Sequence, residues 1–474
     1  MFIKLINGTI VNHDGRYEGD VIIDSTTGKI CQSPAKTVHK VIDCTGKYII
    51  PGGIDPHVHF QMPFCGTVSI DDFENGSKCA LKGGTTMFID YALKSDEPNY
   101  KAAYDTYRKK GESSCCDFGL HMIFVDYNEN IEKEMEFVRT EGITSAKFFY
   151  AYRGALMMEE EKMPAFLTKC RDLKLLPQVH CEDSDIVDAE RTRIFEEYTP
   201  DPFGHCLSRP PYAEGVAAQR CIELASETDV PLYIVHNTHP ESVERIVNAS
   251  QQGKKIVGEA CIVHMAMDWR GAQNKNFDIA AQHILSPPLR EYGINNYIKN
   301  YIVDGDLKLV ATDHCAFNVE QRRMGAEDFR RIPNGMVSVE ERLMVLHELL
   351  VNTGRITMEK FVEVSSYNAT QLLGIPNKGY IAPGYDADIV IWDPTKERVL
   401  SAETHQSHVE VSAWEGYSVT GTPEIVISRG EIVVENGELT DAVAPGRGQY
   451  IKREDSILFS DEIKKLTYNH TKET

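Results

Sequence analysis

The sequence predicts an α/β fold: a closed (β/α)8 or TIM barrel joined to a second, smaller β-sandwich domain built from both termini. Eight short apolar strand candidates alternate with helical segments in the middle of the chain, which is typical of a parallel sheet. Stretches rich in β-forming residues and turn sequences occur at both ends. The 474 residues are enough for one large domain and a satellite.

The domain boundaries follow from where this pattern changes. We expect the small β domain to comprise residues 1–50 and 378–440, and the barrel to span 51–377. Residues 441–474 form a C-terminal tail. Because the tail is polar and charged from Lys452 onward, we expect that part to lie outside both cores.

Short apolar runs between turn sequences predict the strands of the small domain. The first runs are Phe2–Ile6 and Asp20–Asp24, and Asn-Gly, Asp-Gly and Thr-Gly pairs separate the runs of this region. The same pattern of short apolar runs recurs at Ala387–Trp392 and Glu424–Val434. One β domain assembled from the two ends of the chain explains this recurrence.

The barrel strands are predicted from apolar runs that are separated by plausible helices such as 212–226 and 241–250. The first run leads toward Asp55. An open doubly wound sheet would be favoured by a glycine fingerprint after the first strand, and the chain has none. Eight units therefore favour the closed barrel. The strand candidates lie at 48–50, 86–90, 118–124, 144–148, 175–179, 231–235, 255–258 and 307–311.

Composition excludes several classes of function. Lys+Arg 50 against Asp+Glu 71 gives a net charge of −21 without a long basic block, so we expect no nucleic-acid partner and no anionic membrane partner. No apolar run reaches the length of a membrane span, and residues 1–12 lack the features of a signal peptide. The twelve cysteines contain no CxxC pair, which is typical of reduced thiols in a cytoplasmic protein.

Polar residues that can bind metal occur at the ends of several predicted barrel strands. The carboxyl ends of the strands meet on one face of such a barrel, where active sites form. The first, fourth, fifth, sixth and eighth strands bring to this face His57 with His59, Lys147, His180, His236 and Asp313.

These residues together indicate a metal cluster, although each of them alone has an ordinary explanation. His57 and His59 point to the same side of an extended segment and can grip one ion, but a lone HxH is equally well a pair of surface histidines. A single His180 or His236 is more often a core residue, and Asp313 could cap a helix. Polar side chains that end several buried strands on one face are costly without a charged occupant.

Lys147 has two interpretations that the residues alone leave open. A buried lysine tends to lose its proton, and the neutral amine can condense with carbon dioxide to a carbamate that bridges two metals. Alternatively, its ammonium group pairs with an acid.

With these residues, the chain resembles the amidohydrolase superfamily and, more narrowly, the dihydropyrimidinases and D-hydantoinases. HxH is common to the superfamily, whereas its combination with Ser-Pro-Pro-Leu-Arg, a tyrosine five residues after the lysine, and Pro-Asn-Gly is much more specific. The resemblance covers nearly the whole chain. It rests on Pro51–Phe60, Lys147 with Tyr152, Ser286–Arg290, Thr312–Cys315, Pro333–Gly335 and Gly384–Val390.

The resemblance implies two Zn2+ ions per subunit, bridged by an N6-carboxylated Lys147 and a hydroxide. By the match, one ion is held by His57, His59 and Asp313, and the other by His180 and His236. Such a pair of metals generates hydroxide at neutral pH and polarises an amide carbonyl.

The resemblance also implies roles for the residues around the metals. Asp313 serves as general base and acid, and Tyr152 steadies the oxyanion. Backbone groups of Ser286 and Asn334 hold the cyclic imide. For these last two residues the ordinary explanation is a turn, and for Tyr152 it is a packed core aromatic. The resemblance further implies a homotetramer, with the tail as a contact.

We therefore expect a cyclic amide hydrolase that opens dihydropyrimidines or 5-substituted hydantoins, which are cyclic diamides, to N-carbamoyl amino acids. Dihydroorotase-like relatives carry an arginine after HxH, a residue that clamps a carboxylate, whereas Phe60–Phe64 is uncharged here. An allantoinase-like hydrolase is one alternative. A catalytically silent binding or assembly protein is another, but such chains lack several ligands that this one retains.

Two stretches depart from the family pattern. Cys181-Glu-Asp-Ser follows His180, and Asn237-Thr-His follows His236. The ligands themselves are intact, so these changes bear on the substrate side of the pocket.

Overall fold

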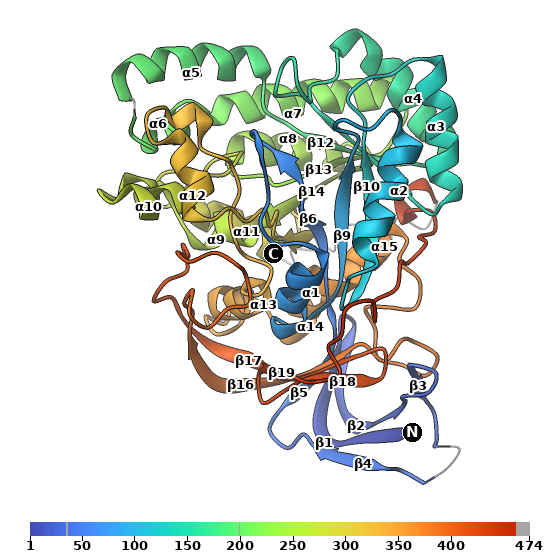
Figure 1. The fold of residues 1–474 in the computed structure, drawn as a ribbon. Coiled ribbons are helices and arrows are strands. Elements are labelled where there is room, and N and C mark those ends of the chain that lie inside the picture. Colours follow the sequence, from blue (N-terminus) through green and yellow to red (C-terminus); the bar gives the residue numbers. More distant parts are fainter. Residues whose placement is uncertain (35–36, 199, 461–474) are drawn as a thin grey trace, which may run out of the picture.

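The computed structural model describes residues 1–34, 37–198 and 200–460. Its central feature is a parallel eight-stranded sheet in the order β15-β14-β13-β12-β11-β10-β9-β6, with helices packed around it (Figure 1). The strands are β6 (Gly53–Val58), β9 (Thr85–Leu93), β10 (Asp117–Ile123), β11 (Ser145–Phe149), β12 (Leu176–His180), β13 (Leu232–Ile234), β14 (Ile256–Cys261) and β15 (Leu309–Ala311).

Hydrogen bonds beyond the first and last strands close this sheet into a barrel. The Asp313 amide donates to the carbonyl of His57 at 2.9 Å, and the His59 amide donates to the carbonyl of His314 at 2.8 Å. The predicted (β/α)8 barrel is therefore confirmed. Closure also places His57, His59 and Asp313 side by side, although they lie far apart in the sequence.

The barrel strands are apolar because both of their faces are covered. An inner cluster takes side chains from strands around the barrel, including Ile54, Met87, Leu176, Val257 and Leu309. A larger cluster lies between the strands and the helices. Burial on both faces explains why these strands appear in the sequence as continuous apolar runs rather than as an alternation.

Helices connect the strands and cover the outside of the barrel (Figure 1). The two segments predicted to be helical at 212–226 and 241–250 are α7 and α8. The principal helices are α1 (Phe73–Lys82), α2 (Tyr100–Gly111), α3 (Glu129–Thr140), α4 (Met163–Leu173), α5 (Ser184–Tyr198), α7 (Pro211–Glu227), α8 (Pro240–Gln251) and α11 (Ile294–Asp304). Shorter α-helices are α6 (Phe203–Leu207), α9 (Ile262–Ala266), α10 (Phe277–Ala280), α12 (Val319–Arg322), α13 (Arg342–Leu346), α14 (Met358–Val362) and α15 (Asn368–Leu373).

Strands from both termini form the second domain, as predicted. They belong to one nine-stranded sheet, in which β1 pairs with β4 over its first half and with β5 over its second half. Isoleucines from the N-terminal and the C-terminal strands of this sheet pack together in an apolar core that is separate from that of the barrel. The strands are β1 (Phe2–Asn12), β2 (Gly15–Asp24), β3 (Lys29–Cys31), β4 (Lys40–Asp43), β5 (Tyr48–Pro51), β16 (Ile389–Val399), β17 (Ser418–Ser428), β18 (Glu431–Glu435) and β19 (Glu438–Leu439).

The predicted first barrel strand at 48–50 is wrong. These residues are β5, which pairs with β1 and β16 of the small domain, and the first barrel strand is β6 from Gly53. The two apolar runs follow each other directly, with only Gly52 between β5 and β6. Hydrophobic patterning cannot assign such neighbouring runs to different sheets.

The prediction that the chain from Lys452 lies outside both cores is wrong for the buried residues Arg453, Ser456 and Leu458, although exposed residues lie between them. Leu458 is buried in the inner cluster of the barrel. The guanidinium of Arg453 is buried, where it donates to the carbonyl of Leu120 and to the hydroxyl of Ser145. Both of these bonds come from Nη2, whereas Nε and Nη1 have no hydrogen-bond partner among the described residues. Residues 461–474 of the predicted tail lie outside the described residues.

Within the described part of the chain, no helix has both the length and the apolar composition that crossing a membrane requires.

Candidate active site

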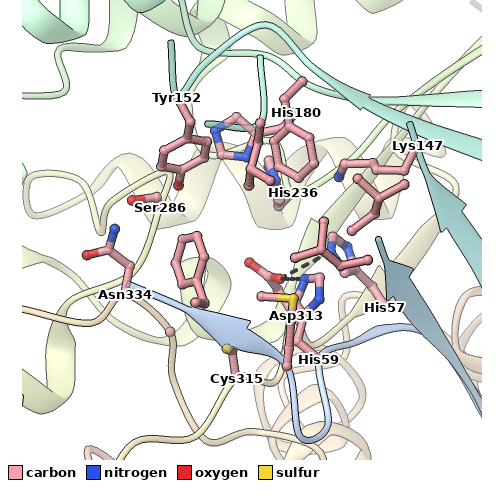
Figure 2. A pocket seen from close by; sticks show the side chains of 17 residues that line it. His57, His59, Lys147, Tyr152, His180, His236, Ser286, Asp313, Cys315 and Asn334 are labelled. Carbon is pink, nitrogen blue, oxygen red and sulfur yellow. Dashed lines mark ion pairs between the residues drawn. The ribbon is translucent and has the colours of Figure 1, made fainter. Parts of the chain in front are cut away.

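A cavity opens at the carboxyl ends of the barrel strands, and all nine residues predicted for the site line it (Figure 2). Its volume, including the open mouth, is about 530 Å³. These residues are His57, His59, Lys147, Tyr152, His180, His236, Ser286, Asp313 and Asn334.

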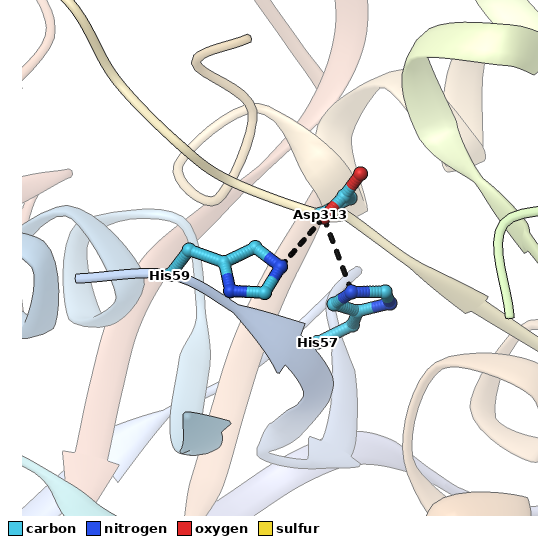
Figure 3. Close-up of side chains that lie close together, drawn as sticks. All are labelled: His57, His59 and Asp313. Carbon is cyan, nitrogen blue, oxygen red and sulfur yellow. Dashed lines mark ion pairs between the residues drawn. The ribbon is translucent and has the colours of Figure 1, made fainter. Parts of the chain in front are cut away.

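His57, His59 and Asp313 form a cluster of potential metal ligands, with one ligand atom of each lying within 4.8 Å of the others (Figure 3). Asp313 Oδ1 lies 3.1 Å from His57 Nε2 and 3.0 Å from His59 Nε2. His57 comes from β6, His59 follows directly after it, and Asp313 follows β15. One small ion between these three atoms would contact all of them.

The electrostatics of this cluster set the charge of each potential ligand. Burial lowers the pKa of His59 to about 4, so its imidazole is neutral. Burial also acts to lower the pKa of His57, but Glu259 and Asp313 outweigh it and raise this pKa to about 9. Burial would raise the pKa of Asp313, yet the histidines hold it well below its usual value. The carboxylate is therefore ionised.

Three site residues adopt left-handed backbone conformations, which are unfavourable for residues other than glycine. The φ angles are 65° at Tyr152, 38° at His236 and 54° at Asp313. Each residue comes within three positions of the end of a barrel strand. Strain of this kind persists only where surrounding contacts enforce it, and it clusters at functional sites.

Lys147 is buried on β11 without an acidic partner. Over the described residues, its ammonium group makes neither a hydrogen bond nor an ion pair with a carboxylate, and the rings of Tyr91 and Phe149 lie 5.1 and 5.2 Å from Nζ. The interpretation of Lys147 as one half of an ordinary ion pair is therefore wrong. Burial lowers its pKa to about 8, so about a tenth of the amine is neutral at pH 7, far more than for an ordinary lysine.

His180 and His236 lie together on the opposite side of the cavity from His59. Their ring centroids are 4.5 Å apart, and the His236 ring is 5.6 Å from that of His57. His180 Nε2 contacts Glu182 Oε2 at 2.7 Å, which leaves Nδ1 as the nitrogen for a ligand. Burial lowers the pKa of both histidines, so both imidazoles are neutral.

Tyr152, Ser286 and Asn334 form the polar end of the cavity (Figure 2). Burial raises the pKa of Tyr152 to about 12, so the phenol keeps its proton and can donate it in a hydrogen bond. Gly335 explains the Pro-Asn-Gly sequence beside Asn334. Its φ is 151°, and an added Cβ would lie 2.3 Å from the carbonyl of Cys315, so only glycine allows this close approach.

The remaining wall of the cavity is apolar. Pro63–Phe64 and Thr67–Val68 form the short hairpin β7-β8, which carries Phe64, while Met62 lies just before it. Both side chains line the cavity. Other apolar lining residues are Leu93, Ile123, Phe149 and Leu156.

Sequence reasoning missed the buried groups that hold the predicted ligands. Glu259 contacts His57 Nδ1 at 2.5 Å. Glu182 links His180 to the buried guanidinium of Arg209, which in turn lies 5.3 Å from the Tyr152 ring centroid. The only available indication was an acid within or next to an apolar strand, as in Ile-Val-Gly-Glu259-Ala-Cys.

The residues present suit divalent metal ions. Nε2 of His57 is buried and makes no hydrogen bond, while its other ring nitrogen is held by a carboxylate, the usual arrangement of a metal-binding histidine. The neutral imidazoles of His59, His180 and His236 and the ionised Asp313 are nitrogen and oxygen ligands of the kind that zinc prefers. His57 would have to lose the proton that Glu259 and Asp313 favour before its Nε2 could bind an ion.

Comparisons with known proteins agree with this architecture. A model of the amidohydrolase family matches residues 48–433. A dihydropyrimidinase of Arabidopsis thaliana is 37% identical over 472 residues, which cover 99% of this chain and 88% of the relative. A D-hydantoinase of Geobacillus stearothermophilus is 39% identical over 456 residues, which cover 95% and 96%. The crystal structure of a dihydropyrimidinase from Brevibacillus agri matches with a TM-score of 0.92 at 38% identity, covering 96% of this chain and 99% of that one.

The chain therefore belongs to the amidohydrolase family. Within this family it groups with the dihydropyrimidinases and D-hydantoinases, and the predicted resemblance is confirmed. It is a hydrolase of that branch.

Proposed function

We propose that the protein opens the ring of a dihydropyrimidine or a 5-substituted hydantoin by hydrolysing one C–N bond, which yields an N-carbamoyl amino acid. The observation that carries the proposal is the meeting of His57, His59 and Asp313 with Lys147 and the second pair of histidines in one cavity. The names of the relatives support this class of ring.

The site would hold two zinc ions. His57, His59 and Asp313 are the proposed ligands of the first ion, and His180 and His236 those of the second. When bound, the ions would activate a water molecule at neutral pH and polarise the amide carbonyl.

Lys147 is the proposed bridge between the two halves of the site, as an N6-carboxylated side chain. Its amine is buried and has no carboxylate partner among the described residues. Condensation with carbon dioxide would convert an uncompensated buried amine into an anionic group with two oxygen ligands. The two ions would in turn compensate the charge of that group.

The chain's own residues would then move the proton and hold the substrate. The ionised Asp313 takes a proton from the attacking water and delivers it to the ring nitrogen as the C–N bond breaks. The protonated phenol of Tyr152 donates a hydrogen bond to the oxygen that gains charge. Backbone groups of Ser286 and Asn334 hold the imide of the ring at the polar end of the cavity.

The apolar wall favours a neutral ring with an apolar substituent. Met62 and Phe64 line the cavity where a carboxylate clamp would require a cation. Dihydroorotate, which carries a carboxylate, is therefore a poor substrate in this proposal. Allantoin has a polar ureido tail that these side chains also suit badly.

We further propose that the protein acts in the cytoplasm as a homotetramer. All twelve cysteines are free, and most of them are buried, which agrees with a reducing compartment. The tetramer rests on the family resemblance, with the tail from residue 441 as a proposed contact.

Side-by-side hydrolysis of four rings tests the proposed reaction and substrate. The zinc-loaded protein is incubated with dihydrouracil, a 5-aryl hydantoin, allantoin and dihydroorotate, and ring-opened products are quantified by mass spectrometry. We expect turnover of the first two substrates and little of the others. Turnover of allantoin alone would replace the proposed substrate class, and no turnover of any ring by the zinc-loaded protein would overturn the function.

A further inference from the structure

We propose that Glu259 is a positioning residue that couples the two halves of the metal site. The first half is His57, His59 and Asp313, and the second half is His180 and His236. This inference rests on the two-metal site of the proposed function. It adds a residue that touches neither metal nor substrate and that decides whether both halves keep their geometry.

The first contact of Glu259 is with the ring of His57. Glu259 is fully buried on β14, and its Oε1 lies 2.5 Å from His57 Nδ1. A carboxylate at this nitrogen fixes the orientation of the ring and the position of its proton, and it makes the opposite nitrogen a stronger ligand. That opposite nitrogen, Nε2, is the one that faces Asp313.

The second contact is with the backbone of the other half. The amide of His236 donates to the same Oε1 atom at 3.0 Å. The amide and the side chain of Asn237 both donate to the main-chain carbonyl of Glu259, at 2.9 and 3.1 Å. These bonds hold His236 at its left-handed φ of 38°, a conformation that needs such support.

The third contact makes the carboxylate itself rigid. The hydroxyl of Tyr233 donates to Oε2, so both carboxylate oxygens are engaged and the side chain has one orientation. The single atom Oε1 of Glu259 thus contacts the ring of His57 in the first half and the backbone amide of His236 in the second. A change at Glu259 must therefore disturb both halves together.

Zinc affinity measured for two substitutions at this position tests the coupling. E259Q keeps the shape and the acceptor oxygen but removes the charge. E259D keeps the charge, but its shorter side chain moves the carboxylate away from His57 and from the amide of His236. If E259Q does not fold, the zinc affinity of E259D tests the coupling. E340Q is the matched control, because Glu340 is also a buried carboxylate with a basic partner, Arg398 at 2.8 Å. Metal-free proteins are titrated with zinc against a chromogenic chelator, and cobalt(II) is added in parallel for its visible spectrum.

We expect E259Q or E259D to weaken the binding of both zinc ions by about 10- to 100-fold and to change the cobalt spectrum. E340Q should match the wild type in both measurements. A merely structural role for Glu259 would lower the melting temperature without changing the cobalt spectrum.

Unchanged affinities, or weakening of one ion alone, would overturn the coupling while leaving the proposed function intact. A wild-type protein that binds no zinc would instead overturn the metal site itself, and the coupling with it.

Discussion

Nε2 of His57 lies 3.1 Å from Oδ1 of Asp313, although His57 lies on the first strand of the barrel and Asp313 follows the last. The same junction carries the hydrogen bond from the Asp313 amide to the His57 carbonyl. Closing the barrel and assembling the first half of the proposed metal site are therefore one structural event. A cation at this point would stabilise the fold as well as serve the reaction.

Asp313→Asn should retain the fold but lower kcat/KM for dihydrouracil by about 10²- to 10⁴-fold. The carboxamide cannot accept the proton that the ionised carboxylate takes. Asp441→Asn, at an exposed position in the C-terminal segment, is the control and should keep full activity. Near-normal turnover in Asp313→Asn would remove this residue from proton transfer.

Lys147→Ala should lose zinc and activity, because the proposed bridging ligand is gone. Short carboxylic acids added to the variant should restore part of the zinc content and of the activity, since their two oxygens can occupy the place of the proposed carbamate. Lys308→Ala is a matched control, because burial likewise lowers the pKa of Lys308 to about 8, yet this lysine precedes β15 at the opposite end of the barrel. The zinc content of the variants is measured by elemental analysis. Full zinc occupancy in Lys147→Ala would contradict the proposal that Lys147 bridges the two ions.

Removing zinc should lower the thermal stability of the protein. A ligand that binds only the folded state adds about 4 kcal/mol at a free concentration a thousand times its Kd. Differential scanning calorimetry before and after chelation measures the effect, and added zinc should restore the original melting temperature. Identical melting curves with and without bound zinc would contradict a structural contribution from the metals.

Lys378→Met should destabilise the junction between the barrel and the small domain by about 3–5 kcal/mol. Lys378 is buried and pairs with Asp117, Asp386 and Asp388 at 2.8, 3.0 and 2.5 Å. Removing its charge takes one cationic partner from each carboxylate, although Asp386 keeps Lys29 and Asp117 keeps Arg429.

Urea unfolding of Lys378→Met can be compared with that of Lys101→Met, which breaks an exposed ion pair with Asp105 and should cost less than about 1 kcal/mol. Equal losses of stability in the two variants would refute the special role of Lys378.

The sequence was sufficient to predict the barrel and the residues that gather in its cavity. Seven of the eight strand candidates overlap barrel strands, because strands buried on both faces leave continuous apolar runs. Residues that follow such runs must meet at one end of a barrel. By this rule the sequence predicts that His57 and Asp313 meet. Their chemical roles remain predictions.

Other features could not be predicted because they depend on contacts between distant segments. Tyr48–Pro51 pairs with strands of the small domain, and an apolar run does not reveal its partners. Arg453 is buried, and its Nη2 donates to a backbone carbonyl and a hydroxyl of the barrel strands, so its polarity gave the wrong expectation. The proposed role of Glu259 depends on its contact with His57, which lies on another strand, so the sequence around Glu259 does not reveal it.

The most direct test of the account is a zinc titration of the metal-free protein during hydrolysis of dihydrouracil. Ring opening is followed by the loss of ultraviolet absorbance, and bound zinc is measured in the same samples. We predict that activity rises with occupancy and reaches its plateau at two zinc ions per chain. Full turnover without metal, or no turnover once two ions are bound, would contradict the proposal of a two-metal ring-opening hydrolase.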